Sequence, residues 1–181
     1  LFAALLNHWG QLGPAEIPPK RQFVVRVTLR IAARRKLPLR PPVPHPFNPL
    51  AALRASPEEV SGDRQLDVVD AMFNACWGRG ENIGDEATLI GALEAAGLDG
   101  RALIERTRAP EIKARLREET EQAIARGVFG VPTVALEGQL FWGDDQLESI
   151  CGVLDGTDPI DAHSIDALTE RAPGLHRPRK P

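Results

Sequence analysis

The segment 133–142 constrains the fold more than any other part of the sequence, because it reads as a pair of β-strands. Thr133–Leu136 and Gln139–Trp142 are short runs typical of strands, and Glu137-Gly138 between them provides a tight turn. An isolated hairpin is only marginally stable in water, so it must join further strands. Apart from extended backbone near Leu1, the sequence shows no strand before residue 133, and we expect a complete sheet to need at least one more strand upstream of Leu1.

Most of the other segments have helical periodicity. We predict helices over residues 20–36, 63–77, 85–96, 99–106 and 110–127, one turn or a longer helix from residue 50, and a last helix that ends at Leu154. Asp144 or Asp145 is positioned to cap that last helix. In 63–77, apolar residues at three- and four-residue steps favour one buried face, made of Leu66, Val69, Phe73 and Trp77. Six prolines between residues 37 and 49 exclude a regular helix there.

Charge is distributed unevenly along the chain. The net charge is −3, but residues 17–57 contain nine lysines and arginines and no acidic residue. A basic block in an otherwise acidic protein favours an anionic ligand near that block. A solvated helix face that pairs with the acidic remainder is the alternative. Nucleic acid is a weaker candidate, because the helix of this block carries an arginine stripe with little aromatic interleaving.

Several functional classes receive no support from the sequence. No apolar run approaches the ~20 residues that span a bilayer, and the first residues lack the basic flank of a secretory signal. Cys76 and Cys151 are far apart and form no CxxC pair, so we predict that both are small buried apolar residues without a disulfide between them. We predict no metal site.

The most specific feature is the run from Gly127 to Thr133, Gly-Val-Phe-Gly-Val-Pro-Thr, with the hairpin and Phe-Trp-Gly-Asp-Asp at 141–145 after it. It resembles the cis-proline loop and glutathione-binding turn of the group of 2-hydroxychromene-2-carboxylate isomerases and kappa-class glutathione transferases. Segments 10–20 and 44–54 and the helices at 63–77 and 110–127 are similar to that group in the same order, so the resemblance covers about residues 1–154.

The resemblance implies an α/β fold, a thioredoxin-like (DsbA-like) sheet with a large inserted helical subdomain. It also implies that the opening β-α unit, with the catalytic serine, lies upstream of Leu1, so no residue of this chain is assigned as catalytic. We divide the chain into residues 1–19 (opening segment of the thioredoxin-like domain), 20–108 (inserted helical subdomain), 109–154 (helix, cis-proline hairpin and helix) and 155–181 (flexible tail).

The resemblance further implies that the cofactor is glutathione. The backbone of Val131, before Pro132 in a cis bond, would pair with the cysteinyl part, as an added strand would. Asp145 would meet the γ-glutamyl ammonium, while Gly143 and Asp144 contribute backbone at a helix N-terminus. The Trp142 side chain would line one side of the glutathione site. The alternatives are a trans proline that opens a strand, aspartates that only cap a helix, and a core tryptophan.

Three residues are predicted to contact the substrate: Gln11, Lys20 and Asn48. A solvated lysine and a turn-forming asparagine are the alternatives. Gln11 departs from the family, which has asparagine after the glycine, and Gln146 stands where the family has arginine.

The function implied is a glutathione-dependent isomerase of the 2-hydroxychromene-2-carboxylate type, which acts by reversible thiol addition to an aromatic carboxylate. A kappa-class glutathione transferase is the first alternative. A non-catalytic glutathione- or partner-binding module, or a DsbA-like oxidoreductase with an upstream CxxC motif, is the second. The expected partners are a small aromatic or electrophilic substrate and a second copy of the chain, with no nucleic acid and no membrane, in the cytoplasm.

Overall fold

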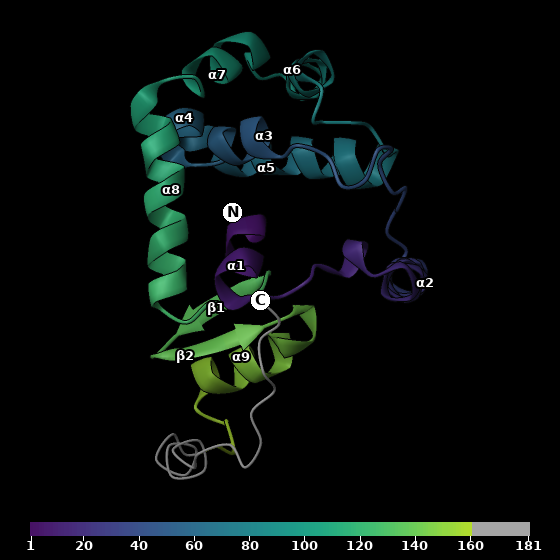
Figure 1. Ribbon diagram of the computed structural model, residues 1–181, viewed down its shortest axis with the longest axis vertical. Helices are drawn as coiled ribbons and strands as arrows, with labels where there is room; N and C mark the ends of the chain where they lie inside the picture. Colours follow the sequence, from purple (N-terminus) through teal and green to yellow (C-terminus); the bar gives the residue numbers. More distant parts are fainter. Residues whose placement is uncertain (161–181) are drawn as a thin grey trace. The chain divides into compact units, whose positions relative to one another are not determined.

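The computed structural model describes residues 1–160, which divide into a compact unit of Leu1–Phe129 and a second that begins at Gly130. The described first unit is helical (Figure 1), with α1 Phe2–Trp9, η1 Pro14–Glu16, α2 Pro18–Arg35, α3 Leu50–Ala55, α4 Glu58–Ser61, η2 Gly62–Arg64, α5 Gln65–Phe73, η3 Asn74–Arg79, α6 Glu86–Ala95, α7 Gly100–Arg106 and α8 Pro110–Ala125. The second unit holds β1 Thr133–Leu136, β2 Gln139–Trp142, η4 Asp144–Gln146 and α9 Leu147–Asp155.

The predicted helices are therefore confirmed to within a few residues, apart from the C-terminal end of 63–77. Most of the predicted tail, residues 161–181, lies outside the described residues.

The core of the first unit lies among α3 to α7. Val68 of α5 packs in one buried cluster with Leu89 and Leu93 of α6, and all three side chains are fully buried. Ile104 of α7 and Val60 of α4 belong to the same cluster. The close approach of these short helices is possible because several cluster residues are alanines, whose small side chains let neighbouring backbones pack closely.

The predicted apolar face of segment 63–77 is buried only in part: Trp77 packs against the core cluster, but two other members are exposed. Leu66 is 77% exposed and Phe73 is 62% exposed, whereas the buried stripe is made of Val68, Ala71, Met72, Ala75 and Cys76. The α-helix also ends at Phe73, and residues 74–79 continue as a π-helix. Both stripes of α5 carry apolar side chains, and packing against α6 selects the one with the smaller residues.

The basic helix α2 packs far less than its apolar content suggests. Ala32 is the one buried residue among its 18. None of the described ion pairs involves Lys20, Arg21, Arg26, Arg30 or Arg34, so these five cations are unpaired in the described part of the chain. The alternative in which this face pairs with the acidic remainder therefore lacks support in the described residues.

The proline-rich segment after α2 contains no helix, as predicted, and it is tied to the end of α5. The backbone N–H of Arg40 donates to the Trp77 carbonyl at 2.7 Å, and Pro42 is fully buried. Gly80 has φ +75°, and a Cβ there would lie 3.2–3.4 Å from Arg40 and Pro41. These contacts give the segment a defined position against η3.

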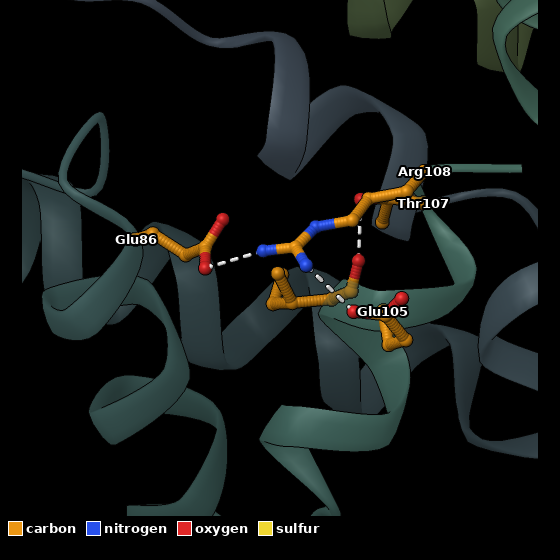
Figure 2. A network of polar contacts seen from close by, with 5 residues as sticks. Glu86, Glu105, Thr107 and Arg108 are labelled. Carbon is orange, nitrogen blue, oxygen red and sulfur yellow. Dashed lines mark hydrogen bonds and ion pairs between the residues drawn. The ribbon is translucent and has the colours of Figure 1, made fainter.

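A surface network joins α6 to α7 (Figure 2). The Arg108 guanidinium donates to Glu86, the first residue of α6, and to Glu105 of α7, each at 2.7 Å. The hydrogen bond that Arg108 donates to Glu86 is the main cause that raises the pKa of Arg108 above its ordinary value. Beneath it, the buried Thr107 hydroxyl donates to the Ile104 carbonyl at 2.7 Å. Because its ion pairs are exposed, we expect this network to contribute little to the free energy of unfolding.

No helix among residues 1–160 combines the length and the apolar character that a membrane crossing requires.

Candidate functional site

The hairpin and the turn that follows it form the candidate site, and every residue in its geometry belongs to the second unit. β1 and β2 pair antiparallel, with Thr133 opposite Trp142 and Leu136 opposite Gln139, so both predicted strands and the Glu137-Gly138 turn are confirmed. The Val131–Pro132 peptide bond is cis. The Gly143 N–H donates to the Pro132 carbonyl at 3.0 Å, which extends the ladder by one step beyond the strands. This hydrogen bond brings the Val131-Pro132 step beside the 142–145 turn.

The backbone of Val131 is available for pairing. No hydrogen bond among residues 1–160 uses its N–H or its C=O, and its side chain is 54% exposed. A backbone position that continues a strand but leaves both polar groups unpaired is a place where an extended peptide adds by strand-like hydrogen bonds. This geometry is the one expected for Val131 from the sequence.

Gly130 and Trp142 fit against each other directly across the turn. A Cβ on Gly130 would overlap the indole of Trp142, so the ring lies on the glycine backbone. Trp142 is 52% exposed, which places one side of its ring in solvent rather than in the core. The Thr133 hydroxyl donates to the Gly130 carbonyl at 2.7 Å and closes the loop below the ring. Trp142 is thus positioned as a wall beside Val131 and Pro132.

Gly143 is favoured in this turn chiefly by its backbone conformation. Its φ is +111°, a conformation that L side chains rarely adopt, and a Cβ there would collide with Oδ1 of Asp145. The Asp145 carboxylate therefore folds back over the backbone of the turn. It is exposed and makes no hydrogen bond or ion pair within residues 1–160. An unpaired carboxylate in this position can accept a ligand's ammonium group.

The prediction that Asp144 or Asp145 caps the last helix was wrong. The two residues form the short 3₁₀ turn η4, and α9 begins at Leu147 with Gln146 at its N-cap position and no side-chain cap hydrogen bond. Gln146 therefore does not cap the first-turn N–H groups of α9 with its side chain, and N–H groups at a helix N-terminus are donors that can bind an anion.

The three predicted substrate residues lie in the first unit. Gln11 follows the left-handed Gly10 at the end of α1, and its N–H donates to the Leu6 carbonyl at 2.9 Å. Lys20 is exposed in the first turn of α2. Asn48 is exposed, and its side-chain oxygen accepts from the Leu50 N–H at 3.1 Å, which is the turn-forming role weighed above. No described contact joins these three residues to one another.

Sequence reasoning missed Gly130 and Thr133 as supports of the site. The signal available was the second glycine of the Gly-Val-Phe-Gly-Val-Pro-Thr run, because close approach of another group to the backbone is one of the uses of glycine. Which side chain approaches is decided by the hairpin register, because Trp142 pairs with Thr133.

Among residues 1–160 no group of three or more His, Cys, Asp or Glu side chains is arranged to hold a metal ion. The two cysteines form no disulfide, and they differ in burial. Cys76 is buried, as predicted, and burial raises the pKa of its thiol to about 11. Cys151 is exposed on α9, so the prediction that it is buried was wrong.

Comparison with known proteins gives a consistent family. The model of the DSBA-like thioredoxin domain matches residues 2–155. A 2-hydroxychromene-2-carboxylate isomerase from Sphingobium xenophagum is 34% identical over 143 residues, 77% of this chain and 71% of that protein. Human glutathione S-transferase kappa 1 is 35% identical over 85 residues, 43% of this chain and 38% of that protein.

A solved structure of 2-hydroxychromene-2-carboxylate isomerase superposes with a TM-score of 0.74 at 24% identity, covering 94% of this chain and 82% of that one. At this identity the match is evidence for the fold alone.

Proposed function

The chain belongs to the family of DSBA-like thioredoxin domains, with homology to 2-hydroxychromene-2-carboxylate isomerases and kappa-class glutathione transferases, and on that premise we propose that it is a glutathione-dependent isomerase. Its fold is the DsbA-like thioredoxin fold, mostly helical with a small two-stranded sheet in the described residues. The observation that carries the proposal is the unpaired backbone of Val131 beside the exposed, unpaired carboxylate of Asp145.

Glutathione fits the groups that this turn presents. It has an extended peptide backbone, a γ-glutamyl ammonium and carboxylates. In our proposal the Val131 N–H and C=O pair with the cysteinyl backbone, and Pro132 and Gly143 hold that edge open. The Asp145 carboxylate receives the ammonium, and the backbone of Asp144 together with the N-terminus of α9 receives the neighbouring carboxylate. Trp142 covers one side of the tripeptide.

Bound glutathione would supply a thiolate that adds reversibly to a conjugated substrate. For the isomerase, the substrate is an aromatic carboxylate, and Gln11, Lys20 and Asn48 are our predicted substrate contacts. We further propose that the protein is a cytoplasmic homodimer that acts on small molecules and uses neither nucleic acid nor a membrane as a partner.

The binding test compares two adjacent aspartates. Wild-type protein should be retained on glutathione-agarose and eluted by free glutathione, and Asp145→Ala should weaken glutathione binding about tenfold or more, because a charge-assisted contact contributes about 1.5–3 kcal/mol. Asp144→Ala is the matched control, since it removes the same charge from the neighbouring residue and leaves the backbone contacts; its binding should change less than threefold. A folded wild type that is not retained would contradict the proposal.

A second candidate function is that of a kappa-class glutathione transferase, favoured by the similarity to the human enzyme. The two activities differ in what happens to glutathione. An isomerase converts 2-hydroxychromene-2-carboxylate without consuming glutathione, whereas a transferase consumes it in proportion to an electrophilic aryl halide. Measuring free thiol during both reactions separates them, and thiol–disulfide exchange without either reaction would favour the oxidoreductase alternative.

A further inference from the structure

The helix α2 presents an exposed basic face. Four exposed side chains follow one another at steps of three and four residues and therefore share one side of the helix: Phe23, Arg26, Arg30 and Arg34. We call these four residues the basic face. Phe23 is 66% exposed, and none of the three arginines takes part in an ion pair among residues 1–160. An exposed aromatic ring beside a row of uncompensated cations fits a partner that is both acidic and apolar.

An acidic face with the same spacing lies on η2 and α5. Its four exposed side chains also follow one another at steps of three and four residues: Asp63, Asp67, Asp70 and Phe73. Phe73 is 62% exposed. Among the described ion pairs, Asp67 pairs with the neighbouring Arg64, and Asp63 and Asp70 take part in none. The acidic face therefore repeats the pattern of the basic face with the opposite charge and in the reverse order.

The two patterns match when α2 and α5 lie side by side and antiparallel. Phe23 then meets Phe73, and each arginine meets one aspartate, in the pairs Arg26–Asp70, Arg30–Asp67 and Arg34–Asp63. The arginine row spans about 12 Å and the aspartate row about 10 Å, because an α-helix rises about 1.5 Å per residue. All three pairs join opposite charges, so the match extends along the whole length of both faces.

A second copy of the chain supplies this match. No described ion pair joins the two faces within one chain, and two basic faces would repel each other. Both faces belong to the compact unit of Leu1–Phe129. A two-fold rotation that places the basic face of one copy on the acidic face of the other therefore makes the same contact a second time, as in any closed symmetric dimer.

We propose that α2 and α5 form the interface of a homodimer, in which the basic face of each copy packs against the acidic face of its partner. The proposal rests on the homodimer proposed above and names its surface, and it is independent of glutathione binding. The aromatic pair is buried at one end of each contact, since aromatic and arginine side chains dominate the binding energy of many interfaces. The charge pairs select the antiparallel register and disfavour other pairings.

The first test reverses the charge of one face at a time. Arg26→Glu/Arg30→Glu makes both faces of a chain acidic, and Asp67→Lys/Asp70→Lys makes both basic. Each double variant alone should raise the Kd of the dimer about hundredfold or more in sedimentation equilibrium, because like charges then meet in both contacts. An equal mixture of the two variants should form a heterodimer with a Kd within about tenfold of the wild type, because every pair in it again joins opposite charges.

Lys113→Glu/Arg117→Glu is the matched control. These two exposed cations also lie four residues apart, on α8, and neither takes part in an ion pair among residues 1–160. The control should dimerise like the wild type. A wild-type dimer that neither charge-reversed variant weakens, an equal loss in the control, or a mixture that stays monomeric would overturn the interface. A monomeric wild type would overturn the homodimer together with it.

The second test concerns the aromatic pair. Phe23→Ala removes one ring from each contact and should raise the Kd of the dimer about tenfold. Leu12→Ala truncates an apolar side chain of similar exposure, 61%, outside both faces, and should leave the Kd within about twofold. Equal effects of the two variants would contradict the aromatic contact. Circular dichroism verifies the fold of each variant, and retention on glutathione-agarose, measured in parallel, reports separately on the Val131–Asp145 turn.

Discussion

Cys76 and Cys151 differ in exposure, and this difference is directly measurable. Cys76 is 1% exposed with its pKa raised to about 11, and Cys151 is exposed on α9. Because the thiolate is the reactive form, we expect one thiol per chain to react with 5,5′-dithiobis(2-nitrobenzoate) at pH 8 in the native protein and two after denaturation. Cys151→Ser should remove the native reaction, whereas rapid reaction of that variant would contradict the burial of Cys76.

The raised pKa of Cys76 also sets the direction of a pH effect. The unfolded thiol ionises near its ordinary value of 9.0, while the folded thiol keeps its proton to about 11. Between these values the folded state binds more protons than the unfolded state, so this group's contribution to the free energy of unfolding is lost as the pH rises. Urea unfolding at pH 8 and pH 10.5 should show a larger loss for the wild type than for Cys76→Ala.

At the residue scale, the sequence predicted which residues belong to the 142–145 turn better than it predicted which groups their side chains contact. It identified Asp145 and Trp142 as residues of the turn, but it assigned a cap to an aspartate that instead folds over Gly143. A carboxylate before a helix can accept hydrogen bonds from several nearby N–H groups. The geometry of the 3₁₀ turn η4 determines which of these groups lie close enough. Cys151 was misplaced because apolar character alone does not tell which face of α9 is covered.

At the element scale, helix α5 offers a test of which stripe supports the core. Val68→Ala removes methyl groups from a fully buried position and should lower the free energy of unfolding by about 2 kcal/mol. Leu66→Ala, two residues earlier, truncates a larger side chain that is 77% exposed, and should change it by less than about 0.5 kcal/mol. Urea denaturation of both variants measures the difference. The reverse order would mean that the side of α5 with Leu66 is the buried one.

The hairpin was predictable to the residue, and α5's orientation was not. Strand length and the Glu137-Gly138 turn are local properties, and both central turn residues have the positive φ that a tight hairpin turn requires. In α5 the two apolar stripes, one through Leu66 and Phe73 and one through Val68 and Met72, satisfy the same helical period. The choice between them is made by α6 and α7, which lie later in the sequence and whose packing the local pattern does not contain.

At the scale of the whole molecule, the fold class was predicted from the resemblance to the isomerase and kappa-class transferase group. The described sheet has two strands and would not by itself indicate a thioredoxin fold. The described residues cluster into two compact units, and the chain passes from the first to the second between Phe129 and Gly130. The division into four parts at residues 19, 108 and 154 stays a prediction.

The proposed homodimer is a property of the whole chain, and large exposed apolar side chains such as Phe23 and Leu66 are consistent with a covered surface. Sedimentation equilibrium should give twice the chain mass at micromolar concentration. A single-chain mass at every concentration tested would contradict the dimer.

The π-helical turn at residues 74–79 has a consequence for the direction of Trp77. Each turn of a π-helix holds more than the 3.6 residues of an α-helix, so the side chains after Phe73 lie at other angles around the axis than a continued α-helix would give them. Deleting one residue from this segment would turn every later side chain of the helix by about 100°. The indole of Trp77 would then lose its edge-on contact with the His45 ring. The length of this short segment therefore sets which part of the proline-rich segment Trp77 can reach.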